Sequence, residues 1–174
     1  MKTQSDRISI FLGFITNPPN LLPFKTPVLI LSGGIDNVPT LPPPPPAPAI
    51  SLACAPDAIS NDRFYQSLSG PTWLLNFTKF GHADMLDDSF ILSPSAVCPT
   101  CTRFLDATTC NYAQFRQDEA NAIADFTNGL VDCGQRRREL RFLTNPEHYF
   151  ESQVTFKSNG FSIKKLNGFC QNYP

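Results

Sequence analysis

The clearest pattern in the chain is a pair of short apolar runs that each end at a glycine turn. Residues 28–31 are continuously apolar between Pro27 and Gly33, and residues 73–77 form a second, largely apolar run before Gly81. Continuous rather than alternating apolarity is typical of strands buried on both faces of a parallel sheet. The pattern therefore predicts two core strands.

A short helix is predicted between these two strands. Phe64, Tyr65 and Leu68 are apolar at helical spacing, Ser60 precedes them as a residue type that caps helices, and the sequence SGP at 69–71 ends the segment. The resulting order is strand, loop, helix, strand. That order predicts a parallel crossover unit.

The strongest helical pattern covers residues 114–133, and Gly134 is expected to stop it. One apolar stripe is predicted from Ala120, Ile123, Phe126, Leu130 and Val131. The acidic residues are expected to lie mostly off that stripe: Asp118, Glu119, Asp125 and Asp132. We interpret this segment as a closing helix that covers the sheet.

The remaining segments divide the chain into three parts. Residues 1–25 are poorly patterned, residues 26–133 hold the predicted α/β elements, and residues 134–174 form a basic C-terminal extension. Long loops are expected at 39–56 and 84–112. The first contains five consecutive prolines, which favour polyproline II and cannot join a sheet.

The extension carries two features of its own. Four arginines lie between Arg136 and Arg141, and residues 154–157 favour a β-strand. We interpret the arginines as a solvated face in preference to a patch that binds an anion or a partner.

Composition and charge exclude some classes of function. A chain of 174 residues can bury a sizeable core. Its 14 basic and 15 acidic side chains give no electrostatic case for nucleic acid, and no apolar run is long enough for a membrane span. Six cysteines permit disulfides without fixing their connectivity. The lone CxxC at 98–101 lacks the second pair that a zinc site needs, and no cofactor is predicted.

Two residues that follow the predicted strands could carry acid–base chemistry. His82, one of only two histidines, comes directly after Gly81, and Asp36 follows the glycine pair at 33–34. Ligand and catalytic sites of open α/β sheets lie at the carboxyl ends of the strands. A histidine base oriented by a carboxylate is the acid–base half of a serine hydrolase. We therefore predict His82 and Asp36 as catalytic residues.

Each of these residues also has a simpler interpretation. His82 could be a histidine that makes one structural hydrogen bond, and Asp36 suits a turn that follows two glycines. Asp84, Asp87 and Asp88 are interpreted as loop carboxylates. The nucleophile is missing, because the sequence contains no G-x-S-x-G turn; its serines near the predicted elements are Ser32, Ser67 and Ser69.

Two motifs resemble the C-terminal part of chlorophyllases, a branch of the α/β-hydrolases. They are ACAPD at 53–57, followed by Asn61 and Phe64, and FGHADMLDD at 80–88. The resemblance covers residues 25–133. It implies an α/β fold that is the C-terminal part of an α/β-hydrolase, with two parallel core strands, a crossover helix, a closing helix and long loops.

The resemblance also implies a function. It points to a serine carboxylesterase that cleaves the phytyl ester of chlorophyll to chlorophyllide and phytol. His82 would be the catalytic histidine. The carboxylate would be either Asp36 or an aspartate after the preceding strand, upstream of Met1. A chloroplast location is suggested by the family alone.

Because the serine half is absent, the sequence resembles a fragment whose isolated form we expect to be inactive, so enzyme status stays open. One alternative is a non-catalytic remnant or interaction module. Another is an esterase or lipase of the same fold with a different ester substrate. A small-molecule ester is the expected partner of the full-length protein. An exposed sheet edge is expected to permit self-association.

Overall fold

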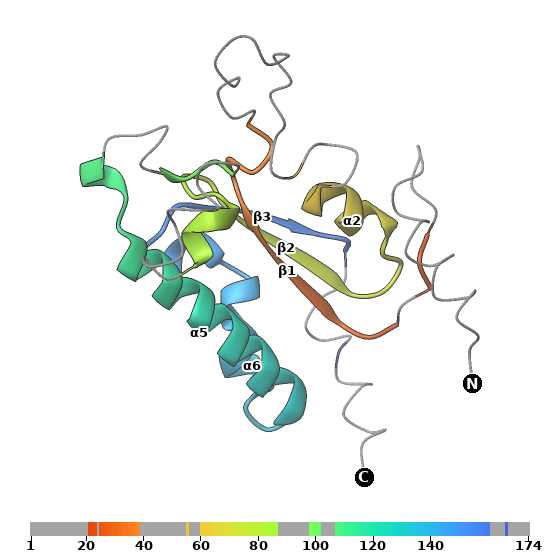
Figure 1. Ribbon diagram of the computed structural model, residues 1–174. Helices are drawn as coiled ribbons and strands as arrows, with labels where there is room; N and C mark the ends of the chain where they lie inside the picture. The colour runs from red at the N-terminus through yellow and green to blue at the C-terminus, as the bar shows by residue number, and fades with distance from the viewer. Residues whose placement is uncertain are drawn as a thin grey trace.

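The computed structural model describes residues 21–23, 25–38, 55, 60–86, 98–101, 107–160 and 166. A mixed three-stranded sheet in the order β1-β2-β3 lies at its centre (Figure 1). β1 (Val28–Gly33) and β2 (Thr72–Phe77) are parallel, which confirms the two predicted core strands. β3 (Val154–Ser158) runs antiparallel along the other side of β2. The β-strand predicted at 154–157 is therefore confirmed, in an α/β fold.

The crossover helix between the parallel strands is α2 (Asn61–Ser67), as the sequence predicts. Ser60 caps it, because its hydroxyl oxygen accepts a hydrogen bond of 3.3 Å from the backbone N–H of Arg63. The helix packs on one face of the sheet. There its Phe64 and Tyr65 adjoin a small apolar cluster formed by Leu22, Ile30, Leu68 and Leu74.

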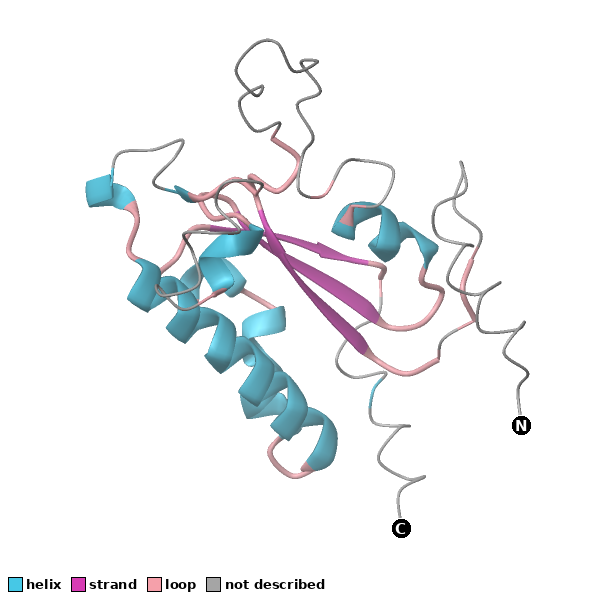
Figure 2. Cartoon of the chain, viewed as in Figure 1, coloured by secondary structure: helices cyan, strands magenta, loops and turns pink. Residues whose placement is uncertain are grey.

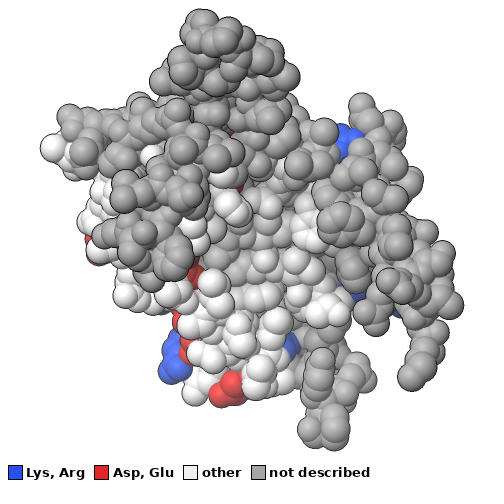
Figure 3. All heavy atoms as spheres, viewed as in Figure 1, with Lys and Arg blue, Asp and Glu red and all other residues white. Residues whose placement is uncertain are grey.

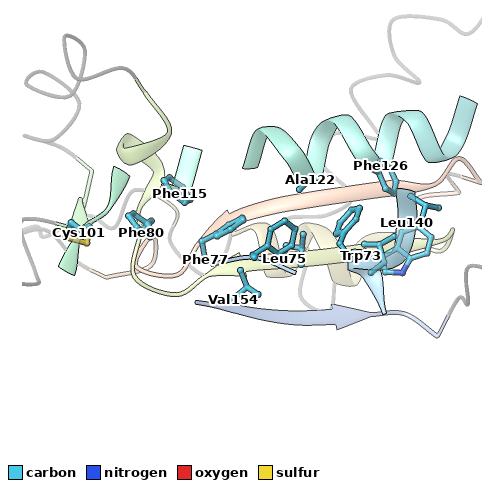
Figure 4. Packing of buried hydrophobic residues seen from close by; sticks show 14 of the residues in the cluster. Trp73, Leu75, Phe77, Phe80, Cys101, Phe115, Ala122, Phe126, Leu140 and Val154 are labelled. Atoms are coloured by element: carbon cyan, nitrogen blue, oxygen red, sulfur yellow. A yellow bond between two sulfur atoms is a disulfide. The ribbon is translucent and has the colours of Figure 1, made fainter. Parts of the chain in front are cut away.

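The opposite face of the sheet is covered by α5 (Tyr112–Val131), which is the predicted closing helix (Figure 2). Alternate residues of β2 point toward it, and aromatic rings dominate the contact (Figure 4). Phe77 meets Phe115 edge to face at 5.2 Å, and Trp73 meets Phe126 at 5.9 Å. Such pairs contribute roughly 0.5–1.5 kcal/mol each beyond their burial.

The face of α5 that is buried differs from the predicted stripe. Ala120 is exposed, Ile123 is 55% exposed and Val131 is 80% exposed. The buried face consists of Phe115, Asp118, Glu119, Ala122, Phe126 and Gly129. The prediction was confirmed for Phe126 and Leu130, which pack in the core, and wrong for the other three positions because two acidic residues lie on the buried face. A hydrophobicity pattern assigns such residues to solvent.

The chain after α5 adds to the same core. It forms α6 (Arg136–Glu139), η5 (Leu140–Leu143) and η6 (Pro146–His148) before β3. Leu140, Phe142 and Phe150 pack in one cluster with β2 and α5. Residues on both sides of the predicted boundary at 133/134 therefore share a core.

The arginine cluster is only partly a solvated face. Arg137, Arg138 and Arg141 are exposed as predicted, but Arg136 is 2% exposed. Its guanidinium donates hydrogen bonds to the carbonyl oxygens of Gly129, Leu130 and Leu166. Arg136 thus satisfies carbonyl groups that the end of α5 leaves without helical partners. On the face shown in Figure 3, charged side chains of both signs lie side by side near this end of the molecule.

Disulfides account for the described cysteines. Cys101 is bonded to Cys110, and Cys98 and Cys133 are also disulfide-bonded. The two cysteines of the CxxC motif are therefore not a redox pair with each other, and neither offers a free thiol to zinc. Disulfides of this kind are typical of oxidising compartments. Within the described ranges, no helix combines the length and apolarity needed to cross a bilayer.

Candidate active site

The turns that follow β1 and β2 pack directly against each other. The backbone N–H of Gly34 donates to the carbonyl of Phe77 at 2.8 Å, and that of Ile35 donates to the carbonyl of Phe80 at 3.2 Å. These bonds extend the parallel pairing past the ends of the strands. They bring the two predicted catalytic turns to one edge of the sheet, as the sequence predicts.

Three glycines make this close approach possible. A Cβ atom on Gly33 would lie 2.7 Å from the carbonyl oxygen of Phe80 and 2.8 Å from Oδ1 of Asp36. One on Gly34 would lie 2.4 Å from a Thr78 backbone atom, and one on Gly81 would lie 2.1 Å from the carbonyl oxygen of Pro99. The glycine turns seen in the sequence are therefore required by backbone packing.

Asp36 is buried at the meeting point of the two turns. Its side chain is 4% exposed, and neither carboxylate oxygen makes a hydrogen bond with a described residue. Burial raises the pKa of Asp36, while the His82 imidazolium and the nearby N–H groups of His82 and Gly33 oppose that rise. An unpartnered buried carboxylate is costly, and groups with such perturbed pKa values cluster at functional sites.

His82 is exposed and begins the single-turn helix η2 (His82–Met85). Asp84 in the same turn fixes its start. Oδ2 of Asp84 accepts hydrogen bonds of 2.8 Å from the backbone N–H groups of Gly81 and Cys101. His82 is therefore held on a short rigid turn with its imidazole open to solvent.

Asp84 itself is fully buried, in contrast to a solvated loop carboxylate. Burial raises its pKa, and the N–H groups of Gly81 and Cys101 oppose the rise. Through Cys101 and its disulfide to Cys110, Asp84 connects the His82 turn to the segment before α5. Its role is to position the turn. Asp87 and Asp88 lie outside the described residues.

A third buried carboxyl group, Glu119 on α5, was not predicted. It is 7% exposed, and its Oε1 has no hydrogen-bond partner among the described residues. Burial, followed by the negative charge of Asp36, raises the pKa of Glu119 to about 7. The only signal in the local sequence would have been a helical periodicity that buries Phe115, Glu119, Ala122 and Phe126 instead of the predicted stripe. Within the described part of the chain, no three His, Cys, Asp or Glu side chains are arranged to hold a metal ion.

A polar cleft of 520 Å³ opens on the face of the sheet that carries α2. Its lining among the described residues includes Asp36, Asn61, Arg63, Asn76 and Lys157, but not His82. The cleft offers both hydrogen-bond donors and acceptors. It is therefore suited to a polar ligand or the polar part of one.

The serines near these elements have structural roles. The hydroxyl oxygen of Ser32 accepts a hydrogen bond of 3.2 Å from the side-chain amide of Asn61. The hydroxyl groups of Ser67 and Ser69 donate to the carbonyl oxygens of Phe64 and Leu22, at 2.7 and 2.9 Å. None of the three stands in a strand–serine–helix turn, the geometry of a hydrolase nucleophile.

Comparisons with known proteins agree with the motifs. A family model described as Chlorophyllase matches residues 8–121, a range that includes both Asp36 and His82. The chain is 34% identical to Chlorophyllase-2 of Arabidopsis thaliana over 64 residues, which is 37% of this chain and 18% of that protein. It is 31% identical to Chlorophyllase type 0 of Chenopodium album over 83 residues, which is 48% of this chain and 20% of that protein. The matched segments thus span about a fifth of the length of these curated relatives.

Proposed function

Because this chain belongs to the chlorophyllase family, we propose that it carries the acid–base side of a serine carboxylesterase site. In this proposal the described domain is the C-terminal part of an α/β-hydrolase fold. β1 and β2 are its last two parallel strands, α2 is the crossover helix and α5 is the closing helix.

The observation that supports the proposal best is the position of Asp36 against the Gly81–His82 junction. The two residues follow neighbouring parallel strands, and the His82 imidazolium opposes the rise that burial causes in the pKa of Asp36. Both oxygens of Asp36 are buried and have no hydrogen-bond partner in the described part of the chain, and His82 is open to solvent. A catalytic base needs both access to substrate and a carboxylate to orient it.

The roles follow from this arrangement. His82 takes the proton of a serine hydroxyl as the serine oxygen attacks the ester carbonyl, and then passes the proton to the leaving alcohol. Asp36 accepts a hydrogen bond from the imidazole and stabilises the imidazolium that forms. Asp84 keeps the His82 turn in place through its two backbone hydrogen bonds.

The proposal assigns the nucleophilic serine to a polypeptide segment other than these 174 residues, since they contain no G-x-S-x-G turn. The first substrate to consider is the phytyl ester of chlorophyll, by family. A different carboxylic ester is the alternative, because substrate choice depends on pocket loops rather than on the fold.

The proposal is tested by the imidazole ¹⁵N–¹H signals of the two histidines in the full chain. We expect His82 to show a stable Nδ1–H signal, shifted downfield by Asp36, that is lost in Asp36→Asn. His148 is an internal control, because it lies in η6 and its Nδ1 is paired with Oδ1 of Asn145 at 2.8 Å. An unchanged His82 signal in Asp36→Asn would rule out the assigned role of Asp36.

A second measurement tests whether the nucleophile lies outside this chain. Purified chain is expected to hydrolyse p-nitrophenyl butyrate no faster than buffer. Hydrolysis by this chain alone that disappears in His82→Ala would show that a nucleophile is present within it, and that part of the proposal would then be wrong.

A further inference from the structure

The floor of the polar cleft is a row of hydrogen-bonding side chains. Ser32 of β1 pairs in register with Asn76 of β2, and Asn76 pairs in turn with Thr155 of β3 (Figure 1). Residues paired across neighbouring strands place their side chains on the same face of a sheet. All three of these residues line the cleft. The floor is therefore polar across all three described strands.

This row interrupts a face that is otherwise apolar. The next pair on the same face, Ile30 and Leu74, is buried. Asn76 is the one residue of β2 that is not buried, although β2 lies between the other two strands. A central strand that helices cover on both faces is ordinarily apolar throughout. An exposed amide at this position therefore indicates a surface that receives a ligand rather than a part of the core.

Three polar groups that line the cleft make no hydrogen bond within the described part of the chain. They are the guanidinium of Arg63, the side-chain amide of Asn76 and the hydroxyl of Thr155. Nε of Arg63 is also buried, so this donor has lost its solvent without gaining an acceptor. All three groups can donate. They are suited to a ligand that carries acceptor atoms.

The charges along the cleft favour a ligand with a single negative charge. Lys157 is already held in an ion pair with Asp62. Asp36 also lines the cleft, but both of its oxygens are buried. Among the described lining residues, two cations therefore balance two anions, and a doubly charged phosphate would lack compensating charge. A carboxylate carries one charge, and its two oxygens match the planar fork of the Arg63 guanidinium.

We propose that this cleft is a binding subsite for a carboxylate group, with Arg63 as the main donor and with Asn76 and Thr155 as further donors. Thr155 belongs to β3, which lies outside the matched family range of 8–121, so the family match does not account for the complete subsite. The cleft shares Asp36 with the proposed acid–base pair. For the substrate, the inference rests on the proposed function: it selects, among carboxylic esters, those that also carry a free carboxylate.

The subsite is tested by titrating the ¹⁵N-labelled full chain with monomethyl succinate, which carries one ester and one carboxylate. The side-chain NH₂ signal of Asn76 is expected to shift and to saturate. Dimethyl succinate, the neutral diester of the same acid, should bind about tenfold more weakly, because it offers no charged acceptor. Equal affinity for the two esters would overturn the carboxylate assignment. An Asn76 signal that shifts with neither ester would overturn the subsite.

Replacing Arg63 tests the main donor. Arg63→Gln should weaken the binding of monomethyl succinate about tenfold and leave the binding of dimethyl succinate unchanged. Arg137→Gln is the matched control, because Arg137 is exposed in α6 and does not line the cleft. Equal weakening in the two variants would reduce the effect to the net charge of the protein and overturn the role of Arg63.

Adding a charge to β3 tests where the ligand lies. Thr155→Asp should abolish the binding of monomethyl succinate, because its carboxylate would repel that of the ligand. Ser158→Asp adds the same charge to the same strand, but Ser158 pairs with Trp73, which packs in the core on the α5 face. This control should bind as the wild type does. Both replaced residues are exposed, and a backbone amide spectrum establishes that the fold is retained.

The outcomes separate this subsite from the proposed function. Binding that is unchanged in both Arg63→Gln and Thr155→Asp would place the ligand elsewhere and overturn the subsite. Carboxylate binding that follows the expectations, together with a His82 signal that ignores Asp36→Asn, would overturn the proposed function and leave the subsite standing. The comparison of the two succinate esters uses the wild type, so it does not depend on the folding of any variant.

Discussion

The two ends of α5 bury charge in opposite ways. At its C-terminal end, Arg136 is 2% exposed and each nitrogen of its guanidinium donates to a backbone carbonyl. Near its N-terminal end, Asp36 and Glu119 are buried to a similar degree, yet three of their four oxygens have no partner among the described residues.

We interpret this difference as one between a structural charge and the proposed functional site. Buried polar groups in folded proteins are almost always hydrogen-bonded, because an unpaired group loses its solvation without compensation. Arg136 follows that rule and completes the end of a helix. Asp36 and Glu119 depart from it among the described residues, and such exceptions are expected where a site must act on protons or ligands.

The largest loss of stability should come from replacing Arg136, the buried charge whose hydrogen bonds are all made. Arg136→Met leaves the carbonyls of Gly129, Leu130 and Leu166 without their donor, which is expected to cost about 4 kcal/mol of unfolding free energy. Urea denaturation measures the loss. Arg137→Met is the control, because Arg137 is exposed and should change stability by less than about 0.5 kcal/mol. Equal losses of stability in the two variants would show that the hydrogen bonds of Arg136 do not stabilise the end of α5.

The buried carboxyl groups near the N-terminal end of α5 should make the free energy of unfolding depend on pH. The pKa of Glu119 is raised from 4.5 to about 7, so between these values the native state holds a proton that the unfolded state has released. Stability therefore falls as pH rises through this window, by about 3 kcal/mol from this group. The raised pKa values of Asp36 and Asp84 act in the same direction.

Urea midpoints measured from pH 4.5 to 8 check this slope. Glu119→Gln cannot ionise and should flatten it, which makes the variant more stable than the wild type at pH 8. Glu147→Gln should keep the wild-type slope. A wild-type protein whose stability is constant over the window would contradict the raised pKa of Glu119.

A smaller effect on stability is expected from Asp36→Asn. The one hydrogen bond proposed for its carboxylate comes from the exposed imidazole of His82 and adds little to stability, and the amide avoids burying a charge. Stability at pH 7 should stay within about 1 kcal/mol of the wild type, and any change should be an increase. The same denaturation series measures it. A loss comparable to that of Arg136→Met would mean that Asp36 is structural, and the contrast between the two ends would fail.

Much of the fold could be predicted because its signals are local. The apolar runs of β1 and β2, the glycine turns and the Ser60 cap are each set by a few neighbouring residues. The same glycines place Asp36 and His82 at one edge of the sheet. The sequence-derived family resemblance agrees with the comparisons for the same reason, since it rests on contiguous motifs.

The features that were missed depend on contacts between distant segments. Arg136 is buried because its guanidinium reaches the end of α5 and Leu166, which the run of arginines does not reveal. Glu119 is buried because Phe115 stacks on Phe80 and sets the rotation of α5 about its axis. Neither is visible in the periodicity, because both buried residues are charged.

The smallest expected effect on stability comes from a variant that separates the two causes acting on the pKa of Asp36, its burial and the charge of His82. His82→Ala removes the imidazolium that lowers the pKa of Asp36 but keeps the backbone N–H at that position. The pKa of Asp36 should therefore rise further above its usual value, with little change in stability because His82 is exposed. ¹³C-carboxyl titration measures the shift, and His148→Ala is the control. If the two variants gave the same Asp36 titration, the imidazole would not act on this carboxylate, and the unsatisfied end of α5 would have to be explained by Glu119 alone.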